Sequence, residues 1–194
     1  MISRSCSLER TTRETSITLD LNLDVAGERA VDTGIGMLDH LLDALALHAG
    51  WSLSLRCRGD LQVDDHHTVE DCALVLGQAL DTCLGDRTEL VRFGQAYAPL
   101  DEALARSVVD LATRPHATVV LGLAREQLGA MACENITHLL QSLAMAGRFC
   151  LHVDTLRGDN DHHRAEAAVK SLALALRRAT TRQTTGLAST KGVL

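Results

Sequence analysis

Aromatic side chains are nearly absent from this chain of 194 residues, at only 2%. Hydrophobic residues still make up 46%, so the core must consist mostly of Leu, Ala and Val. Leu and Ala favour helices and Val favours strands, which predicts helices packed on a sheet. Proline is equally scarce, and we expect both prolines, Pro99 and Pro115, at turns.

The chain also lacks the features of membrane, secreted and nucleic-acid-binding proteins. No apolar run approaches the ~20 residues that span a bilayer, and residues 1–13 lack the apolar core of a signal peptide. A net charge of −6 argues against a broad nucleic-acid-binding face. Six scattered cysteines without a Cys-x-x-Cys pair indicate reduced thiols. We therefore expect a cytoplasmic protein with no membrane or nucleic-acid partner.

The sequence repeats itself. A His-Leu-Leu segment begins at His40 and again at His138, 98 residues later. A His-His-x-x-Glu motif begins at His66 and again at His162, 96 residues later. Matching order at nearly the same offset indicates a duplicated unit. We predict a first half at 1–91, a second half at 92–183, and a C-terminal tail at 184–194 that contributes to a site.

Each half contains strand and helix patterns. Alternating apolar residues predict strands at 17–25 and 51–57, and helical spacing follows each of them. In the second half we expect strands at 104–112, 116–122 and 149–156, and helices at 134–146 and 162–180. The predicted fold is α/β (α+β), an internally duplicated two-layer unit in which each half is a small mixed sheet packed with two helices. A pseudo-twofold axis is expected to relate the halves.

Helical geometry gives the residues of each double-histidine motif different roles in metal binding. We expect each motif to begin a helix, with Asp65 and Asp161 as N-caps. His66 and Glu70 are four residues apart, so they lie on one face and can clamp one ion. His67 is turned away by about 100° and cannot join that clamp. The second motif predicts the same arrangement.

Together with His40 and His138, the motifs supply six imidazoles and two carboxylates, which is enough for two metal ions. The pseudo-twofold axis predicts two equivalent ligand sets: His40, His67, His162 and Glu166 for one ion, and His138, His163, His66 and Glu70 for the other. Such sets suit Mn(II), Fe(II), Zn(II) or Co(II) better than Ca(II) or Mg(II). Four protein ligands leave two open positions on an octahedral ion but close a tetrahedral zinc site, which favours manganese and catalysis.

Specific stretches give the chain a resemblance to imidazoleglycerol-phosphate dehydratases over nearly its whole length. They are residues 13–15 (Arg-Glu-Thr), 33–40 (Thr-Gly-Ile-Gly-Met-Leu-Asp-His), 64–71 (Asp-Asp-His-His-Thr-Val-Glu-Asp), 99–103 (Pro-Leu-Asp-Glu-Ala), 158–163 (Gly-Asp-Asn-Asp-His-His) and 189–194 (Ser-Thr-Lys-Gly-Val-Leu). The departures, among them Leu139-Leu140 where the family usually has Phe-Phe, concern packing rather than ligands.

The resemblance implies a ribosomal protein S5 domain 2-like fold and a hydro-lyase of histidine biosynthesis. It also implies two Mn(II) ions per active site and a homo-oligomer of 24 subunits, with sites where subunits meet. The two ligand sets then need not come from one chain. The implied reaction converts D-erythro-imidazole glycerol phosphate into imidazole acetol phosphate. An imidazolate bridging both ions would expel the hydroxyl, and a protein base would then remove a proton.

The resemblance also implies substrate-binding residues. Glu14 matches a position near the substrate and is expected to act as an acid/base; His48 matches a position that contacts the substrate, and we count it with Glu14 as catalytic. We expect the phosphate group of the substrate to be bound by basic and hydroxyl side chains of the protein. The full predicted substrate set is Glu14, His40, His48, Arg92, Arg114, Ser189, Thr190 and Lys191.

Two other readings remain open. A dinuclear metallohydrolase would need a carboxylate that bridges the metals, and the paired motifs supply no obvious third carboxylate. A metal-storage or metal-sensing oligomer would need no role for Glu14, Arg92, Arg114 or Lys191.

Overall fold

The protein is described here by a computed structural model that covers residues 3–183 together with 186, 189 and 191. Its first half forms a four-stranded sheet in the order β1-β2-β4-β3, with two helices. The elements are β1 (Ser5–Thr11), β2 (Thr15–Asn22), β3 (Arg29–Asp32), α1 (Gly36–Ala49), β4 (Ser52–Gly59) and α2 (His66–Leu84). The sheet is mixed, because β1, β2 and β4 pair antiparallel while β3 runs parallel to β4.

The second half repeats this topology with the sheet order β5-β6-β10-β7, and here β7 is the parallel edge strand. The elements are β5 (Phe93–Leu100), β6 (Ala103–Asp110), β7 (His116–Val120), β8 (Gln127–Leu128), β9 (Met131–Ala132), α3 (Cys133–Ala146), β10 (Cys150–Arg157) and α4 (Asp161–Ala179). The short β8–β9 pair before α3 has no counterpart among the elements of the first half. The predicted duplicated fold, with a mixed sheet and two helices in each half, is confirmed.

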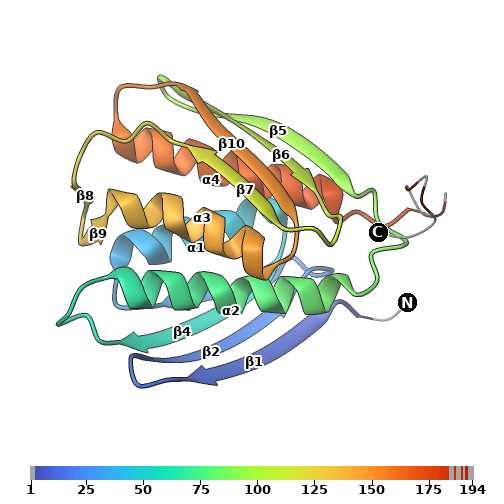
Figure 1. Ribbon diagram of the computed structural model, residues 1–194, viewed down its shortest axis with the longest axis horizontal. Coiled ribbons are helices and arrows are strands. Elements are labelled where there is room, and N and C mark those ends of the chain that lie inside the picture. Colours follow the sequence, from blue (N-terminus) through green and yellow to red (C-terminus); the bar gives the residue numbers. More distant parts are fainter. Residues whose placement is uncertain (1–2, 184–185, 187–188, 190, 192–194) are drawn as a thin grey trace.

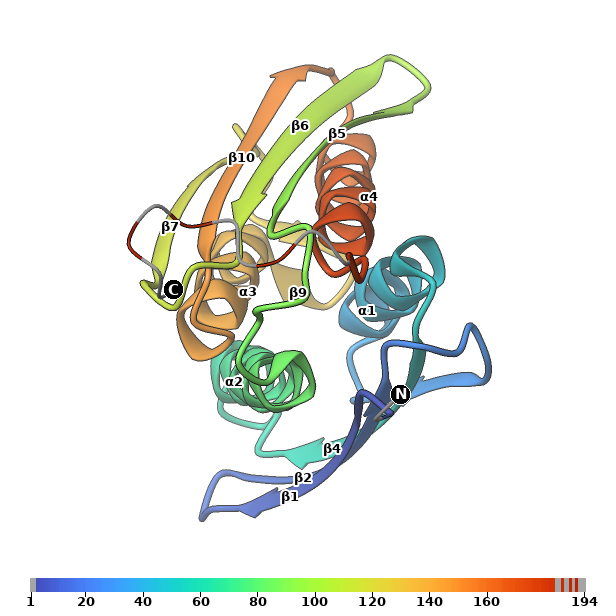
Figure 2. The same cartoon turned by 90° about the vertical axis from the view of Figure 1, so that its right-hand side faces the viewer.

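The two sheets form the outside of the molecule and the four helices lie between them (Figures 1 and 2). Helices α1 and α2 pack on the first sheet, and α3 and α4 on the second. Across the middle, α1 packs against α4 and α2 against α3. One continuous core of Leu, Ala, Val, Ile and Cys side chains fills the space between the layers. The site-bearing helices are therefore held from both sides.

The local sequence explains most of these elements. In β2, Ile17, Leu19 and Leu21 point into the core while the residues between them are exposed, as the alternation predicts. Helix α1 ends at Gly50, whose φ of 76° is a conformation that glycine adopts without strain. The placement of Pro99 at a turn is wrong, because Pro99 lies within β5. An edge strand tolerates proline, since one side of it makes no ladder hydrogen bonds.

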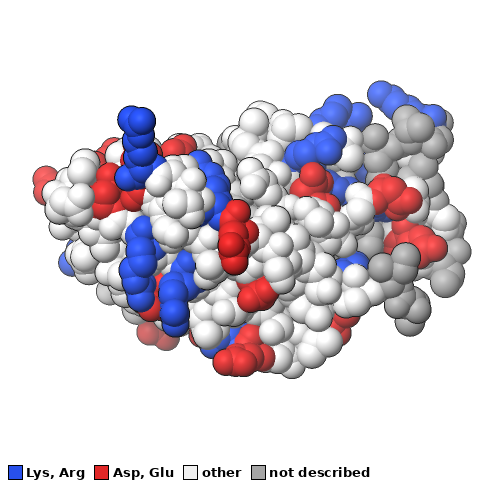
Figure 3. Space-filling view, turned by 90° about the horizontal axis from the view of Figure 1, so that it is seen from below, with Lys and Arg blue, Asp and Glu red and all other residues white. Residues whose placement is uncertain are grey.

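One face of the molecule carries charges of both signs. The face seen in Figure 3 shows basic and acidic side chains interspersed rather than one continuous basic area. Arg56 and Arg58, for example, both lie near the carboxylate of Asp32. Within the described part of the chain, no helix is both long and apolar enough to cross a membrane.

Arg87 joins the two halves from the segment between them. Its side chain is fully buried, and its guanidinium donates to the carbonyl oxygens of Leu111 at 2.9 Å, Arg148 at 2.8 Å and Gly147 at 2.8 Å. It also donates to the carboxylate of Asp81 near the end of α2. One side chain thus connects the end of α2 to segments of the second half that follow β6 and α3.

We expect Arg87→Met to lower the free energy of unfolding by about 3 kcal/mol or more, because it leaves a carboxylate and buried carbonyl oxygens without their donor. The control is Arg148→Met, since Arg148 lies 3.6 Å from the same Asp81 but is 54% exposed. The control should lose less than ~1 kcal/mol. Urea unfolding followed by circular dichroism measures both, and equal losses would contradict the assigned role.

Candidate metal centres

The first candidate centre lies between α1 and α4, and we call it the α1–α4 cluster. Nε2 of His40 lies 2.9 Å from Oε2 of Glu166, and Nε2 of His162 lies 3.2 Å from the same oxygen. The rings of His40 and His162 stack with their centroids 5.4 Å apart. Ligand atoms from all three residues lie within 4.8 Å of one another, close enough to bind one ion.

Glu166 in this cluster is held as an anion. Burial alone would raise the pKa of its carboxyl, but hydrogen bonds from Lys170 and His40 outweigh burial and bring the pKa to about 2. Lys170 lies one helical turn further along α4, and its Nζ is 2.7 Å from Oε1 of Glu166. Because Lys170 occupies Oε1, the other oxygen is the one that faces the two imidazoles.

The second candidate centre lies between α2 and α3, and we call it the α2–α3 cluster. Nε2 of His138 lies 3.0 Å from Oε1 of Glu70, and the rings of His138 and His66 stack at 4.9 Å. Nδ1 of His66 lies 2.9 Å from the side-chain oxygen of Asn135, which leaves Nε2 of His66 for a metal. Ligand atoms of His66, Glu70 and His138 also lie within 4.8 Å of one another.

The two clusters follow the pseudo-twofold arrangement of the fold. Each combines the His-x-x-x-Glu clamp of one half with a histidine of the other half, as the sequence predicted. Helix packing explains this exchange, because α1 faces α4 and α2 faces α3. That these residues bind metal is still a prediction, although three nitrogen and oxygen donors at this spacing suit a divalent transition metal.

The fourth member of each predicted set lies elsewhere in this chain. Nδ1 of His67 lies 3.1 Å from Asp60, and its Nε2 lies 3.8 Å from Glu14. Nδ1 of His163 lies 2.7 Å from Glu102. Neither imidazole belongs to the groups of closely spaced ligand atoms found among the described residues. The 100° turn between consecutive helical residues accounts for the separation, so a single chain does not assemble the four-ligand sets.

The helix starts differ from the prediction. Asn160, not Asp161, caps α4, and its side-chain oxygen accepts from the backbone N–H groups of His162 and His163. Asp161 is buried and instead accepts from the backbone N–H groups of Ala124 and Arg125. Asp65 does occupy the N-cap position of α2, but its side chain makes no capping bond and accepts from the Ala132 N–H. Both aspartates therefore fix neighbouring loops rather than the helix ends.

The two predicted catalytic residues lie on different elements. Glu14 sits in the turn between β1 and β2, 52% exposed. His48 lies two turns beyond His40 on α1 and is half-buried. Burial lowers the pKa of His48, and the charge of Lys170 lowers it further, against the opposing effect of Glu166. His48 is therefore in the electrostatic reach of the α1–α4 cluster.

Arg92, one of the predicted phosphate-binding residues, lies far from the α1–α4 cluster in this chain. Arg92 donates from Nε and Nη2 to Asp110 at 2.7 and 3.1 Å, and its backbone N–H donates to the carbonyl of Ala179 at the end of α4. Ala179 lies thirteen residues after Glu166 on α4, which corresponds to about 20 Å. A single chain therefore does not bring Arg92 to the α1–α4 cluster.

The described part of that set also includes Arg114, Ser189 and Lys191. Arg114 is exposed in the segment that leads into β7. In the tail, the backbone N–H of Lys191 donates to Oγ of Ser189 at 3.2 Å. Thr190 lies outside the described residues.

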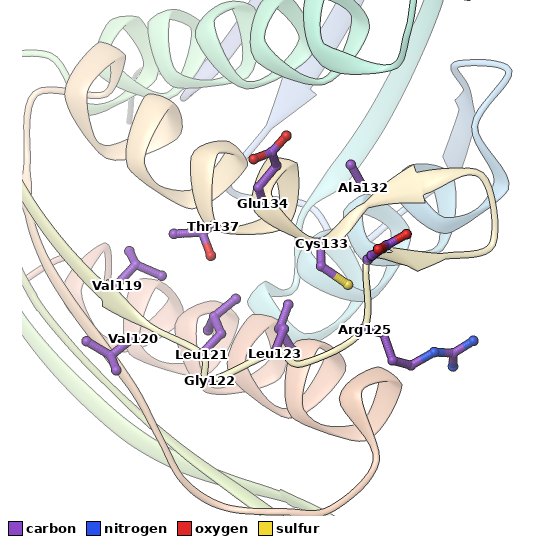
Figure 4. A pocket seen from close by; sticks show the side chains of 11 residues that line it. Val119, Val120, Leu121, Gly122, Leu123, Arg125, Ala132, Cys133, Glu134 and Thr137 are labelled. Carbon is purple, nitrogen blue, oxygen red and sulfur yellow. The ribbon is translucent and has the colours of Figure 1, made fainter.

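Two hollows adjoin α3. One of about 300 Å³ lies at the α2–α3 cluster and includes His66 and His138 in its wall. A larger one of about 600 Å³ shares Glu134 and Thr137 with it. Figure 4 shows the larger hollow between the end of β7 and the start of α3, with mostly apolar side chains around it. None of the predicted metal- or substrate-binding residues is among those that line it, so the larger hollow is not where those residues meet.

Sequence reasoning missed four residues that hold the histidines and Glu166 in place: Asp60, Glu102, Asn135 and Lys170. A signal existed for Lys170, because it follows Glu166 at helical spacing. Glu102 lies in the Pro-Leu-Asp-Glu-Ala stretch, but its distance of 61 positions from His163 hides the contact.

Comparison with known proteins settles the family. A profile described as "Imidazoleglycerol-phosphate dehydratase" matches residues 33–176, the stretch that contains both clusters. The chain belongs to this family. Its members are hydro-lyases of histidine biosynthesis, so the resemblance noted in the sequence is confirmed.

Individual relatives agree with the profile. An imidazoleglycerol-phosphate dehydratase from Trichoderma harzianum is 52% identical, over 90% of this chain and 95% of the relative. One from Phytophthora nicotianae is 53% identical over 98% of this chain, which spans only 42% of that protein. Among solved structures, the enzyme from Staphylococcus aureus superimposes with a TM-score of 0.84 at 33% identity, covering 92% of this chain and 99% of that one.

Proposed function

We propose that the protein dehydrates D-erythro-imidazole glycerol phosphate to imidazole acetol phosphate, using two Mn(II) ions. Family membership supports a dehydratase of histidine biosynthesis. The observation that carries the finer proposal is the pair of equivalent His-His-Glu clusters, one between each pair of packed helices. A reaction that needs two metal ions at one substrate ring fits a duplicated donor set of this kind.

The donors present fit Mn(II). Each cluster offers two imidazoles and one carboxylate, a mixture that suits a first-row transition metal better than Ca(II) or Mg(II). His67 and His163 are the fourth ligands that we assign to the two sets. Bound there, the ions would hold the substrate imidazole as an imidazolate and so make loss of its neighbouring hydroxyl feasible.

The chain's own residues supply proton transfer and orientation. Glu14 is the proposed acid/base, because its half-exposed carboxylate lies 3.8 Å from His67 and so borders the proposed metal. His48 is the proposed second catalytic residue. Its lowered pKa favours the neutral imidazole, which can both accept and donate a hydrogen bond. His40 and His48 project from the same face of α1, where both can contact the substrate.

The proposed phosphate site includes Arg92, which this chain keeps apart from its α1–α4 cluster. Arg92, Arg114, Ser189, Thr190 and Lys191 are the proposed phosphate-binding groups, and Arg92 lies at the far end of α4. We therefore propose a homo-oligomer, of 24 subunits by resemblance, in which one chain supplies the clusters and a neighbour supplies the phosphate site. In the same arrangement, His67 or His163 of one chain would complete the ligand set of a cluster in a neighbouring chain. The proposed location is the cytoplasm.

The purified protein should dehydrate imidazole glycerol phosphate when Mn(II) is present, lose this activity after EDTA treatment, and regain it when Mn(II) is restored. The reason is that the proposed ions activate the substrate ring directly. Product formation measured in all three samples checks this. A protein that binds two Mn(II) per chain but forms no product under any condition would instead favour metal storage or sensing.

Replacing Glu14 with Gln removes the proposed proton carrier while preserving its size. We expect kcat to fall by about 10²–10⁴-fold with Mn(II) content unchanged, because general acid–base catalysis contributes rate on this scale. Steady-state kinetics together with elemental analysis measure both quantities. The control is Glu9→Gln, an exposed carboxylate on β1, which should keep the original kcat. A near-normal kcat in Glu14→Gln would show that Glu14 is not the acid/base.

A further inference from the structure

His67 and His163, the second histidines of the two motifs, each have a carboxylate at Nδ1. Asp60 places its two oxygens 3.2 and 3.1 Å from Nδ1 of His67. Glu102 places Oε2 at 2.7 Å from Nδ1 of His163. A carboxylate at Nδ1 accepts the ring proton there, which leaves the lone pair on Nε2. Both rings are only partly exposed, at 31% and 26%, so these contacts orient them against the protein surface.

We propose that Asp60 and Glu102 are positioning residues, which fix His67 and His163 in the Nδ1–H tautomer and so present Nε2 as a metal ligand. This inference rests on the proposed metal dependence of the enzyme. A free neutral imidazole can carry its proton on either nitrogen. A fixed tautomer removes that competition, and loss of such a partner typically weakens metal binding by about 10–100-fold.

Glu102 is itself rigidly held. Its Oε1 accepts from the backbone N–H groups of Asp159 at 3.1 Å and Asn160 at 2.8 Å, directly before α4. Its Oε2 accepts from the His163 ring, so the two oxygens of Glu102 have different partners. The hydrogen bond from His163, followed by that from the Asn160 N–H, lowers the pKa of Glu102 to about 2. The turn between β5 and β6 is thereby fixed to the start of the helix that it serves.

Asp60 contacts the histidine of the first half in the same way but from a different position in the fold. It follows β4, and its backbone N–H donates to the carbonyl oxygen of Glu14 at 3.0 Å. The residue that orients His67 is therefore tied to the turn that bears the proposed acid/base. Asp60 is only 17% exposed on its side chain, which limits competition from water for the imidazole.

Comparison of the two halves distinguishes a carboxylate that orients a histidine from the carboxylate proposed as the acid/base. Glu14 and Glu102 occupy equivalent turns, between β1 and β2 and between β5 and β6. Glu102 uses both oxygens in hydrogen bonds, whereas Glu14 is 52% exposed and approaches His67 only to 3.8 Å, on the Nε2 side. Asp101 in the second turn lies 3.8 Å from Nε2 of His163, as Glu14 does from Nε2 of His67. Glu102 is therefore the carboxylate of that turn that orients the ring, while Glu14 lies on the open Nε2 side of His67.

The test titrates metal-free protein with Mn(II) and follows bound ions per chain by electron paramagnetic resonance. Wild type should bind two ions. Glu102→Ala should weaken one of them by about 10–100-fold and leave the other unchanged. Asp60→Ala should weaken only the other ion, and the double variant should weaken both. The control is Asp159→Asn, which removes an exposed charge beside the same helix start and should leave both affinities unchanged.

Two further measurements keep the result interpretable. Glu102→Gln retains one acceptor oxygen, which can serve either the His163 ring or the backbone N–H groups but not both. It should therefore lose less affinity than Glu102→Ala and should fold if the alanine variant does not. Nitrogen NMR of the metal-free protein should show His163 as the Nδ1–H tautomer in wild type and a loss of that preference in Glu102→Ala.

Unchanged affinities and an unchanged tautomer in the folded alanine variants would overturn the positioning role. Failure of wild type to bind Mn(II), with the tautomers nevertheless shifted in the variants, would overturn the proposed metal dependence and leave the orientation of the rings established.

Discussion

Consecutive residues on an α-helix point about 100° apart, and this constraint determines the arrangement of the whole site. In each double-histidine motif only the first histidine can share a face with the glutamate four positions later. His66 therefore joins Glu70, while His67 turns toward Asp60. The same division separates His162 from His163. Two neighbouring imidazoles in the sequence thus belong to different surroundings in the structure.

Because the fold is duplicated and its helices pack in pairs, the separation of the two histidines in each motif produces two equivalent clusters. Because α1 packs on α4 and α2 on α3, each clamp receives a histidine from the opposite half. The sheets on the outside hold these helices at fixed separations. The halves are not identical, since Lys170 secures Glu166, whereas Leu74 stands at the corresponding place after Glu70. The α1–α4 cluster therefore has a cation beside it, and His48 faces that cation with a lowered pKa.

The sequence predicted the duplication, the four helices and the members of both clusters, because each depends on short-range periodicity or on a spacing that repeats. It missed β1, β3 and β5, which lie at the sheet edges and bury few or none of their side chains completely. It also placed the cap of α4 at Asp161, because two acceptors, Asn160 and Asp161, precede the helix and only the fold shows that the aspartate bonds to another loop. Partners such as Glu102 depend on contacts between distant segments, which no local pattern contains. The distance of Arg92 from the α1–α4 cluster is likewise a property of the folded helix α4.

That separation is the central claim to test, because it requires active sites built from more than one chain. Two variants, Arg92→Ala and Glu166→Gln, should each be inactive alone if the phosphate site and the metal clamp are both essential. Co-expressed with different affinity tags and purified as mixed assemblies, they should regain dehydratase activity, because some sites then combine an intact clamp from one chain with an intact Arg92 from its neighbour. Activity in the mixed assemblies no greater than that of the separate variants would contradict a shared site.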